Sequence, residues 1–342
     1  MIRMSTAQMF NTGLYNMTQS QSRMNHTNNQ LGSGKAIVTP ADDPVASAQT
    51  LNTKTRISVV AQQTRNADFA DKNLSQTESV LDQMESSLIR LKEMAVQLSS
   101  DQWSDEQVKA TGLEAKEILG HLQGLVNTKN ESGEYIFAGS QADQKAYNGN
   151  EFQGDPIERE AQVADDTFIK MLTSGDRAFE NLDGLRMVDA NGDEVFWQSD
   201  GSGADNAAVG VGDIPAVADP STPSVGNMLG VIQYFVNATG NGTGGTVADV
   251  DKEAIRTSMD NIDIAFEQLS QTRSQIGSRQ NTLEAVINSN EDFELFAKKS
   301  LSELEDLDYA EAITRFQQQQ MSLQAGQQAF SRVSQLSLFN YI

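Results

Sequence analysis

The chain contains no cysteine, which excludes disulfides, thiolate catalysis and zinc sites built on sulfur. Histidine is almost as scarce: His26 and His121 lie far apart on segments that we predict to be helical, and each is interpreted as a helix-surface residue. Basic side chains are also few, with 25 Lys and Arg against 47 Asp and Glu, a formal charge of −22. A charge of this size repels nucleic acid and anionic membranes, so we expect neither as a partner. The simplest interpretation of the acidity is solubility.

Long apolar runs are missing as well. No stretch of the 342 residues could cross a membrane, and the start "MIRMSTAQMFNTG" lacks the apolar run of a secretory signal. We therefore expect a protein that stays in the cytoplasm or leaves by a route that reads no cleavable signal. Catalytic groupings are absent too, because the carboxylate pairs Asp42–Asp43 and Asp165–Asp166 lie in polar surroundings. The sequence predicts no catalytic residue, no metal and no cofactor.

Glycine and proline are rare at both ends of the chain. Seventeen of the 25 glycines and four of the six prolines lie between residues 133 and 245. This distribution predicts long helices at both ends that enclose a loop-rich middle with β-strands. The expected fold class is α+β: a long antiparallel helical bundle or coiled coil built from the N- and C-terminal segments, with a β-rich outer domain inserted between them. We assign residues 1–40 with 309–342 to terminal helical arms, 41–139 with 250–308 to the inner bundle, and 140–249 to the outer domain.

The inner segments carry apolar seams with the spacing of a coiled coil. On the N-terminal side, apolar or small residues alternate at spacings of three and four; the predicted seam is Val60, Gln63, Ala67, Ala70, Leu74, Thr77, Leu81, Met84, Leu88, Leu91, Ala95 and Leu98. A second seam runs from Ile255 to Leu304. Between the two, Ser104 and Gln107 predict a capping box that opens a further helix. Packing of both halves into one bundle is the simplest arrangement, and coiled coils that dimerise independently are the alternative.

The terminal arms carry one complete apolar row and a second row that turns polar. Ten residues form the predicted assembly interface: Phe10, Leu14, Met17, Met24, Leu31, Tyr309, Ile313, Phe316, Leu323 and Phe330. One buried anchor per heptad returns about 1.5–3 kcal/mol, whereas ordering each backbone residue costs about 1–2 kcal/mol. We therefore expect the arms to be disordered in the monomer and to become helical on binding partners.

The stretch "LGSGKAIVTPADDPVASAQ" first suggests a phosphate loop or a metal site. No Ser or Thr follows its lysine, and two adjacent carboxylates offer no cage for a metal. The same residues predict a joint between arm and bundle. Gly32 or Gly34 suits the left-handed turn that ends a helix, Pro40 keeps the preceding residue extended, and Asp43 suits a helix cap with Pro44 at the first helical position.

The middle segment contains the β-like runs "EYIFAG", "RMV" and "EVFWQ", and Asn191-Gly192 between the last two suits a tight hairpin turn. Residues 189–193 also place three oxygen-bearing side chains at the spacing of a calcium loop. Glu194 and Asp200 stand where that loop needs glycine and glutamate, so the hairpin is favoured. The run "NATGNGTGGT" has no lysine and predicts a flexible loop.

Several motifs together resemble the flagellin superfamily of bacterial flagellar proteins. Residues 65–99 are similar to the signature inner helix of that family, "RSQIGSRQNTLE" to its C-terminal counterpart, and "DLDYAEAITRFQQQQMSLQAGQQAF" to its terminal segment. Three motifs, "TPADDPVAS", "GEYIFAGS" and the ending "SLFNYI", favour the branch that joins hook to filament over filament flagellin. The segment from Phe152 to Phe179 resembles the start of the outer domain in that branch. Filament flagellin, or a coiled-coil signalling or adhesin module, remains the alternative.

The resemblance implies an extracellular structural protein of the flagellum that is not an enzyme. Copies of the chain would form a ring between the first hook-associated junction protein, next to the hook, and the flagellin of the filament. It further implies that subunits leave unfolded through the flagellar type III export apparatus, after a chaperone has held the C-terminal region. The inner bundle would set the subunit's shape, and the terminal arms would pair with each other and with neighbouring subunits.

Overall fold

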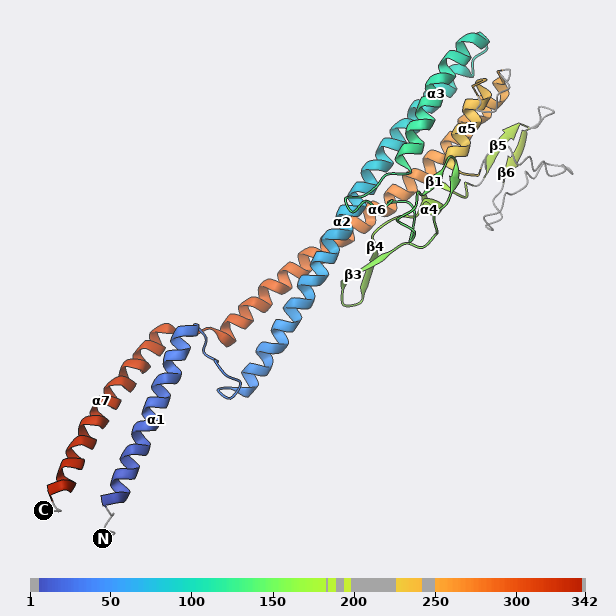
Figure 1. Ribbon diagram of the computed structural model, residues 1–342. Coiled ribbons are helices and arrows are strands. Elements are labelled where there is room, and N and C mark those ends of the chain that lie inside the picture. The colour runs from blue at the N-terminus through green and yellow to red at the C-terminus, as the bar shows by residue number, and fades with distance from the viewer. Residues whose placement is uncertain (1–5, 183, 189–193, 198–225, 242–249, 340–342) are drawn as a thin grey trace. The chain divides into compact units, whose positions relative to one another are not determined.

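The structure is a computed structural model that describes residues 6–182, 184–188, 194–197, 226–241 and 250–339. Its residues divide into two units, a terminal unit of residues 1–62 with 291–342 and a central unit of residues 63–290. Two long helices, α2 (Pro44–Leu98) and α6 (Lys252–Glu305), contribute residues to both units (Figure 1). Long helices from both ends of the chain thus accompany small sheets in the middle, which confirms the predicted fold class. The three-part division into arms, bundle and outer domain stays a prediction.

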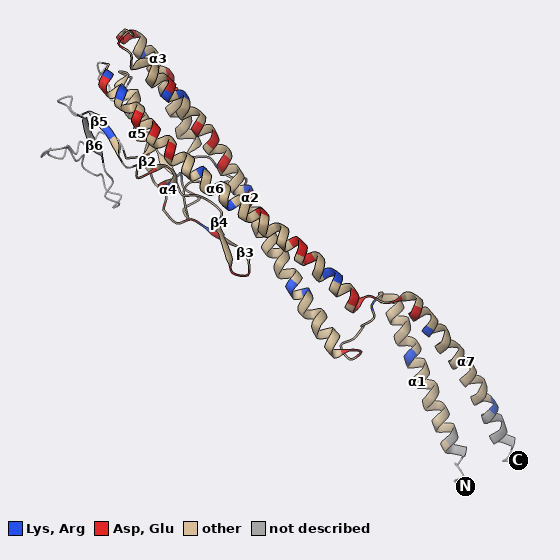
Figure 2. Cartoon of the chain, turned by 180° about the vertical axis from the view of Figure 1, so that it is seen from behind, with Lys and Arg blue, Asp and Glu red and all other residues tan. Residues whose placement is uncertain are grey.

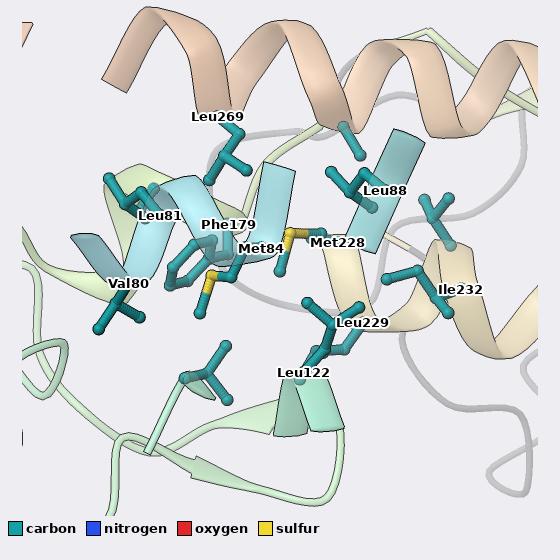
Figure 3. Close-up of a cluster of buried hydrophobic side chains, with 14 of the residues drawn as sticks. Val80, Leu81, Met84, Leu88, Leu122, Phe179, Met228, Leu229, Ile232 and Leu269 are labelled. Atoms are coloured by element: carbon teal, nitrogen blue, oxygen red, sulfur yellow. The ribbon is translucent and has the colours of Figure 1, made fainter. Parts of the chain in front are cut away.

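The apolar seam of α2 forms the core of the bundle. All twelve predicted seam positions are buried, including the polar Gln63 and Thr77. The seam of α6 is buried at Ile255, Ile262 and Leu269 and continues through two further apolar residues. Figure 3 shows side chains from α2, α3 (Asp105–Leu125), α4 (Gly175–Phe179), α5 (Met228–Ala238) and α6 meeting in this core. Because full burial of one such side chain is worth about 1.5–3 kcal/mol, the seam stabilises the central unit.

The predicted capping box at the start of α3 is confirmed. The Ser104 hydroxyl oxygen accepts from the backbone N–H of Gln107 at 3.4 Å, and Gln107 Oε1 accepts from the backbone N–H of Ser104 at 3.1 Å. A cap that the sequence analysis missed lies at the start of α6. There Asp251 Oδ1 accepts the backbone N–H groups of Glu253 and Ala254, each at 3.0 Å.

In the part of the middle segment that the structure describes, the strands form three two-stranded hairpins: β1 (Tyr147–Asn148) with β2 (Glu151–Phe152), β3 (Glu160–Ala164) with β4 (Thr167–Lys170), and β5 (Leu185–Val188) with β6 (Glu194–Trp197). The last pair confirms the predicted hairpin of "RMV" and "EVFWQ", with Val188 opposite Glu194. Its turn at Asn191-Gly192 and the calcium-loop positions lie outside the described residues.

In the middle segment, one local prediction was wrong and one helix was missed. The run "EYIFAG" forms no strand: Tyr135 makes one isolated bridge to Lys129, and the next three residues are buried in turns that end at Gly139, where φ is +69°. The segment "MLGVIQYFVNA" is a helix, α5, which packs against α3. Because α5 is short and buried on nearly all sides, it lacks the exposed polar face by which a surface helix is recognised. α5 ends at Ala238, so the first two residues of the predicted flexible loop, residues 237–246, are helical. Residues 242–246 of that loop lie outside the described ranges.

One motif that favoured the hook–filament branch, "GEYIFAGS", meets the segment from Phe152 to Phe179 in the central unit. The backbone N–H of Gly175 donates to the carbonyl of Phe137 at 2.8 Å, and the rings of Phe137 and Phe179 lie 4.9 Å apart. Arg159 donates to both carboxylate oxygens of Glu134, at 3.1 and 2.8 Å. The segments 133–140 and 152–179 therefore belong to one packed structure.

A half-buried carboxyl group lies beside these segments. Tyr147 Oη donates to Glu180 Oε1 at 2.8 Å, and the Tyr147 side chain is fully buried. Burial raises the pKa of Glu180 to about 7, and the nearby charge of Asp176 raises it further, against hydrogen bonds from Tyr147 and Asn227 that lower it. The folded chain therefore holds a proton on Glu180 in a pH range where an exposed glutamate has lost it.

This proton gives the central unit a pH dependence that a Glu180→Gln variant lacks. The carboxyl group is neutral in folded and unfolded chains below about pH 4.5; as the pH rises towards 7 it ionises in the unfolded chain but stays protonated in the folded chain, which favours unfolding. Across that interval, the free energy of unfolding of the native chain should fall by on the order of 2–3 kcal/mol relative to the variant. Urea unfolding followed by circular dichroism at several pH values measures the difference. Equal pH slopes for the two chains would contradict the burial of Glu180.

Candidate assembly surface on the terminal helices

The candidate site is the pair of helices at the two ends of the chain, α1 (Thr6–Ser33) and α7 (Tyr309–Phe339). They lie side by side and antiparallel within the terminal unit (Figure 1). At their outer end, the rings of Phe10 and Phe330 lie 4.8 Å apart. Gly13 faces the same ring closely enough that a Cβ there would come within 3.1 Å of it. The absence of a side chain on Gly13 thus lets the two backbones approach.

The contact between α1 and α7 is incompletely filled. A groove of about 410 Å³ lies between them, lined by Thr12, Gly13, Asn16, Met17, Ser20, Ser322, Leu323, Gly326, Ala329 and Phe330. Within the described part of the chain, the buried Gln319 Oε1 has no hydrogen-bond donor. Unfilled volume forfeits dispersion contacts, and a buried acceptor without a donor costs about 1–3 kcal/mol. The pair is therefore weaker than a packed core of the same length.

The ten predicted interface residues follow one side of this pair without being fully buried. Half-buried are Met17, Met24, Leu31, Phe316, Leu323 and Phe330. The other four, Phe10, Leu14, Tyr309 and Ile313, are exposed. Sequence reasoning missed Ala312, which is fully buried, and the buried Thr27 and Gln30, because small and polar residues carry no apolar signal. The role of the ten residues in assembly stays a prediction.

The terminal helices also differ from the remainder of the chain in charge. Residues 1–41 contain no acidic side chain, and Glu311 is the one acidic residue among residues 309–342. Figure 2 shows α1 and α7 almost free of charged residues, in contrast to the acidic α3. A surface of Gln, Asn, Ser and Thr can approach a copy of itself without like-charge repulsion.

The joint between α1 and α2 is built by both ends of the chain. Gly34, with φ at +72°, ends α1 and donates its N–H to the carbonyl of Gln30 at 2.9 Å. Ala36 N–H donates to the carbonyl of Glu305 at 2.8 Å, and Leu307 N–H donates to the carbonyl of Gly34 at 3.0 Å. Of the two glycines considered for the turn, Gly34 makes it, because Gly32 lies inside α1.

A buried carboxylate holds this joint. Glu305 forms ion pairs with Lys35 and with Lys54, the latter at 2.7 Å. Hydrogen bonds from Lys35 and then Lys54 hold the pKa of Glu305 below its usual value. Sequence reasoning missed Glu305, because the partners come from opposite ends of the chain and no local pattern joins them.

The two adjacent aspartates of the joint accept hydrogen bonds from backbone N–H groups. Asp43 Oδ1 accepts the N–H groups of Val45 and Ala46, each at 3.0 Å, and α2 begins at Pro44. Asp42 closes the turn that contains Pro40: its carboxylate accepts backbone N–H groups at 3.0 and 2.8 Å, and its own N–H donates to the carbonyl of Thr39. At the start of α7, Asp308 Oδ1 accepts two backbone N–H groups in the same way, at 2.9 and 3.2 Å.

Neither a metal site nor a membrane span is found among the residues that the structure describes. No group of three or more His, Asp or Glu side chains is placed to hold a metal ion. No helix is both long enough and apolar enough to cross a bilayer.

Comparison with known proteins places the chain in a family. The family model for the bacterial flagellin N-terminal helical region matches residues 4–142, and that for the C-terminal helical region matches residues 259–342. Together the two models match nearly two thirds of the chain, at both of its ends and in the order found in flagellins. The chain belongs to the bacterial flagellin family.

Within that family, the relatives matched over their whole length are of one kind. Flagellar hook-associated protein 3 of Escherichia coli K12 is 25% identical over 341 residues, 99% of either chain. The protein of the same name from Salmonella typhimurium is 23% identical over 340 residues, again 99% of either chain. The "Flagellar filament 41 kDa core protein" of Borreliella burgdorferi is 22% identical over 271 residues, 78% of this chain and 77% of that protein. The resemblance to the hook–filament junction branch is confirmed.

Solved structures share the fold. A putative flagellar hook-associated protein from Vibrio parahaemolyticus matches with a TM-score of 0.58 at 18% identity, over 78% of this chain and 100% of that one. Flagellar hook-associated protein 3 from Legionella pneumophila matches with a TM-score of 0.55 at 19% identity, over 74% and 98% of the two chains. The long helices with small inserted sheets are thus an architecture already seen in flagellar proteins.

The geometry of the joint makes opposite predictions for its two glycines. Gly34→Ala places a Cβ on a residue with φ at +72° and 2.9 Å from the Tyr309 hydroxyl, which should cost about 1–2 kcal/mol locally. Gly32→Ala, inside α1 with open space around it, should stabilise the helix by about 0.5–1 kcal/mol. Amide hydrogen exchange at Ala36 and Leu307 should therefore quicken in the first variant and not in the second. Equal exchange in the two variants would contradict the described turn.

Proposed function

We propose that this chain is a structural, non-enzymatic subunit that joins the flagellar hook to the filament. The observation that carries the proposal is the agreement over the whole length with two proteins named flagellar hook-associated protein 3. The terminal unit supports it, because α1 and α7 present apolar residues that their pairing leaves half-buried or exposed. Those residues require further chains to cover them.

The proposed partners lie on either side of a ring formed by copies of this chain. On the hook side the ring contacts the first hook-associated protein, and on the filament side it contacts flagellin. Subunits reach this place outside the cell in an unfolded state, through the flagellar type III export apparatus. Before export, a cytoplasmic chaperone holds the C-terminal region, where the exposed Ile313 and Met321 of α7 are the apolar side chains to shield.

The division into two units indicates how assembly proceeds. The central unit carries a continuous core that each subunit completes alone. In the terminal unit, the groove and the unpaired Gln319 acceptor leave the helix pair only marginally favourable. Residues 1–40 and 309–342 are therefore expected to be disordered in the free monomer and ordered in the assembled junction, where neighbouring chains cover their apolar row.

Filament flagellin is the second candidate, since the filament core protein of Borreliella burgdorferi matches over most of the chain. The two functions differ in how the purified chain behaves. A junction subunit stays monomeric alone because its ring forms on a hook, whereas a filament subunit polymerises without limit. Sedimentation of the purified chain separates them: fast-sedimenting polymers would overturn the junction proposal.

Loss of three apolar residues from α7 should prevent assembly without unfolding the subunit. The triple variant Phe316→Ala, Leu323→Ala, Phe330→Ala removes half-buried side chains of the terminal unit only. We expect its urea-unfolding midpoint to match that of the native chain, because the core of the central unit is untouched. In a strain without its own junction protein, the native chain should restore filaments and the variant should not.

A matched control uses three exposed glutamines of the same helix, Gln317, Gln324 and Gln328. Their replacement by Ala leaves the apolar row intact and should reduce filament number far less. If the apolar triple variant restored filaments as well as the native chain does, α7 would not be an assembly surface.

A further inference from the structure

The N-terminal fifth of the chain has a charge opposite to that of the rest. Residues 1–67 contain six Lys or Arg and only two acidic residues, Asp42 and Asp43, in a chain with 47 Asp and Glu. The carboxylates of both aspartates accept hydrogen bonds from backbone N–H groups of the joint. The first turns of α2 therefore belong to a basic strip on a strongly acidic protein.

Within this strip, residues 44–62 of α2 expose large apolar side chains. Val45 is 69% exposed and Leu51 is 66% exposed, and Val59 is exposed as well. The charged residues among them are Lys54 and Arg56, and none is acidic. We call the exposed apolar surface of Val45, Leu51 and Val59 the basic face of α2, because the only charged residues of its segment are Lys54 and Arg56.

A second exposed apolar surface lies on the last part of α6, in the same terminal unit. Leu295 and Phe296 are each 70% exposed, which is unusual for adjacent large side chains of a folded protein. Glu291 and Asp292 precede them by three to five positions, so these carboxylates flank the apolar pair on the helix surface. Residues 291–308 hold seven acidic and two basic side chains. We call the exposed apolar surface of Leu295 and Phe296 the acidic face of α6, because the segment around it is net acidic.

Contacts inside one chain do not cover either face. The two segments already touch through Lys54, which pairs with Glu305, and through Arg56, whose guanidinium lies 5.6 Å from the Phe293 ring centre. With these two contacts formed, Val45, Leu51, Leu295 and Phe296 still have the exposed fractions given above. Lys298 and Lys299 also flank Leu295 and Phe296, but residues 291–308 are net acidic and residues 44–62 are net basic. Each face thus combines uncovered apolar area with a segment of opposite net charge.

We propose that the basic face of α2 in one copy of this chain binds the acidic face of α6 in the next copy. The inference rests on the proposed ring of copies and names the surfaces that close it. The contact is heterologous, because two different faces meet, and a heterologous contact with a closing rotation generates a ring. Apolar burial supplies the affinity, and the opposite charges select the partner face and disfavour contacts between like faces.

The absence of cysteine makes a direct test possible. One copy of the chain carries Leu51→Cys, a second carries Leu295→Cys, and the two are co-expressed in a strain without its own junction protein. After oxidation of isolated flagella, the proposal expects a disulfide-linked dimer that contains one copy of each variant. Either variant alone should give no dimer, because its cysteine meets a leucine on the neighbour. A dimer from one variant alone would indicate a two-fold contact and overturn the proposal.

The control pair is Leu113→Cys with Ile157→Cys, two exposed apolar residues of the central unit, and it should give no dimer. Restoration of filaments by the native chain tests the proposed function separately. If the native chain restores filaments and the Leu51–Leu295 pair gives no dimer, the inference fails and the function stands. If the native chain never enters flagella, the proposed function fails as well.

A second variant keeps the test decisive where a cysteine variant is poorly incorporated. The double variant Leu295→Ser, Phe296→Ser removes the two apolar side chains of the acidic face. Both are exposed, so the variant monomer should unfold at the same urea concentration as the native chain. Its retention in isolated flagella should fall by about tenfold or more, because two apolar contacts are lost. Phe168→Ser, at an exposed residue of β4, should leave retention unchanged. Native retention of the double variant would overturn the proposal.

Discussion

Burial of the α2 seam against helices from the other half of the chain is the contact on which the structure depends. Every seam position from Val60 to Leu98 is buried, and α6, α3 and α5 each contribute side chains to the same core. Where the seam of α6 turns polar, Arg273 pairs with Glu78 at 2.6 Å and with Asp82 at 3.0 Å, both from α2. The core therefore sets the register of two helices that no short loop connects.

The terminal unit follows the opposite rule. Its outer helices, α1 and α7, enclose a groove and carry almost no charge. We propose that these features weaken the helix pair in a free subunit and suit a surface that other chains cover. On that proposal, a subunit combines a core that it completes alone with a helix pair whose stability depends on neighbours.

Sequence reasoning predicted the fold where the signal is local and periodic. The α2 seam, the capping box at Ser104 and the β5–β6 hairpin all rest on residues a few positions apart. It missed α5, a short helix buried on nearly all sides, and failed at "EYIFAG", whose apolar residues are buried by turns rather than by a strand. It also missed Glu305 and Ala312, because an ion pair between distant segments and a small buried residue leave no pattern in one sequence. The candidate site was predicted as rows of residues and a joint; the groove and the ion pairs of Glu305 with Lys35 and Lys54 required the structure.

Residues that pair in the bundle lie far apart along the sequence, and this affects the order of folding. Arg273 bonds to Glu78 across 195 residues, and Gln280 bonds to Ser75 across 205. Loop closure over such distances is slow, because chain entropy is lost before the contacts that repay it can form. The core of the central unit therefore cannot close before residues near Gln280 are available, about four fifths of the way along the chain. High contact order makes completion of this core a late step in folding.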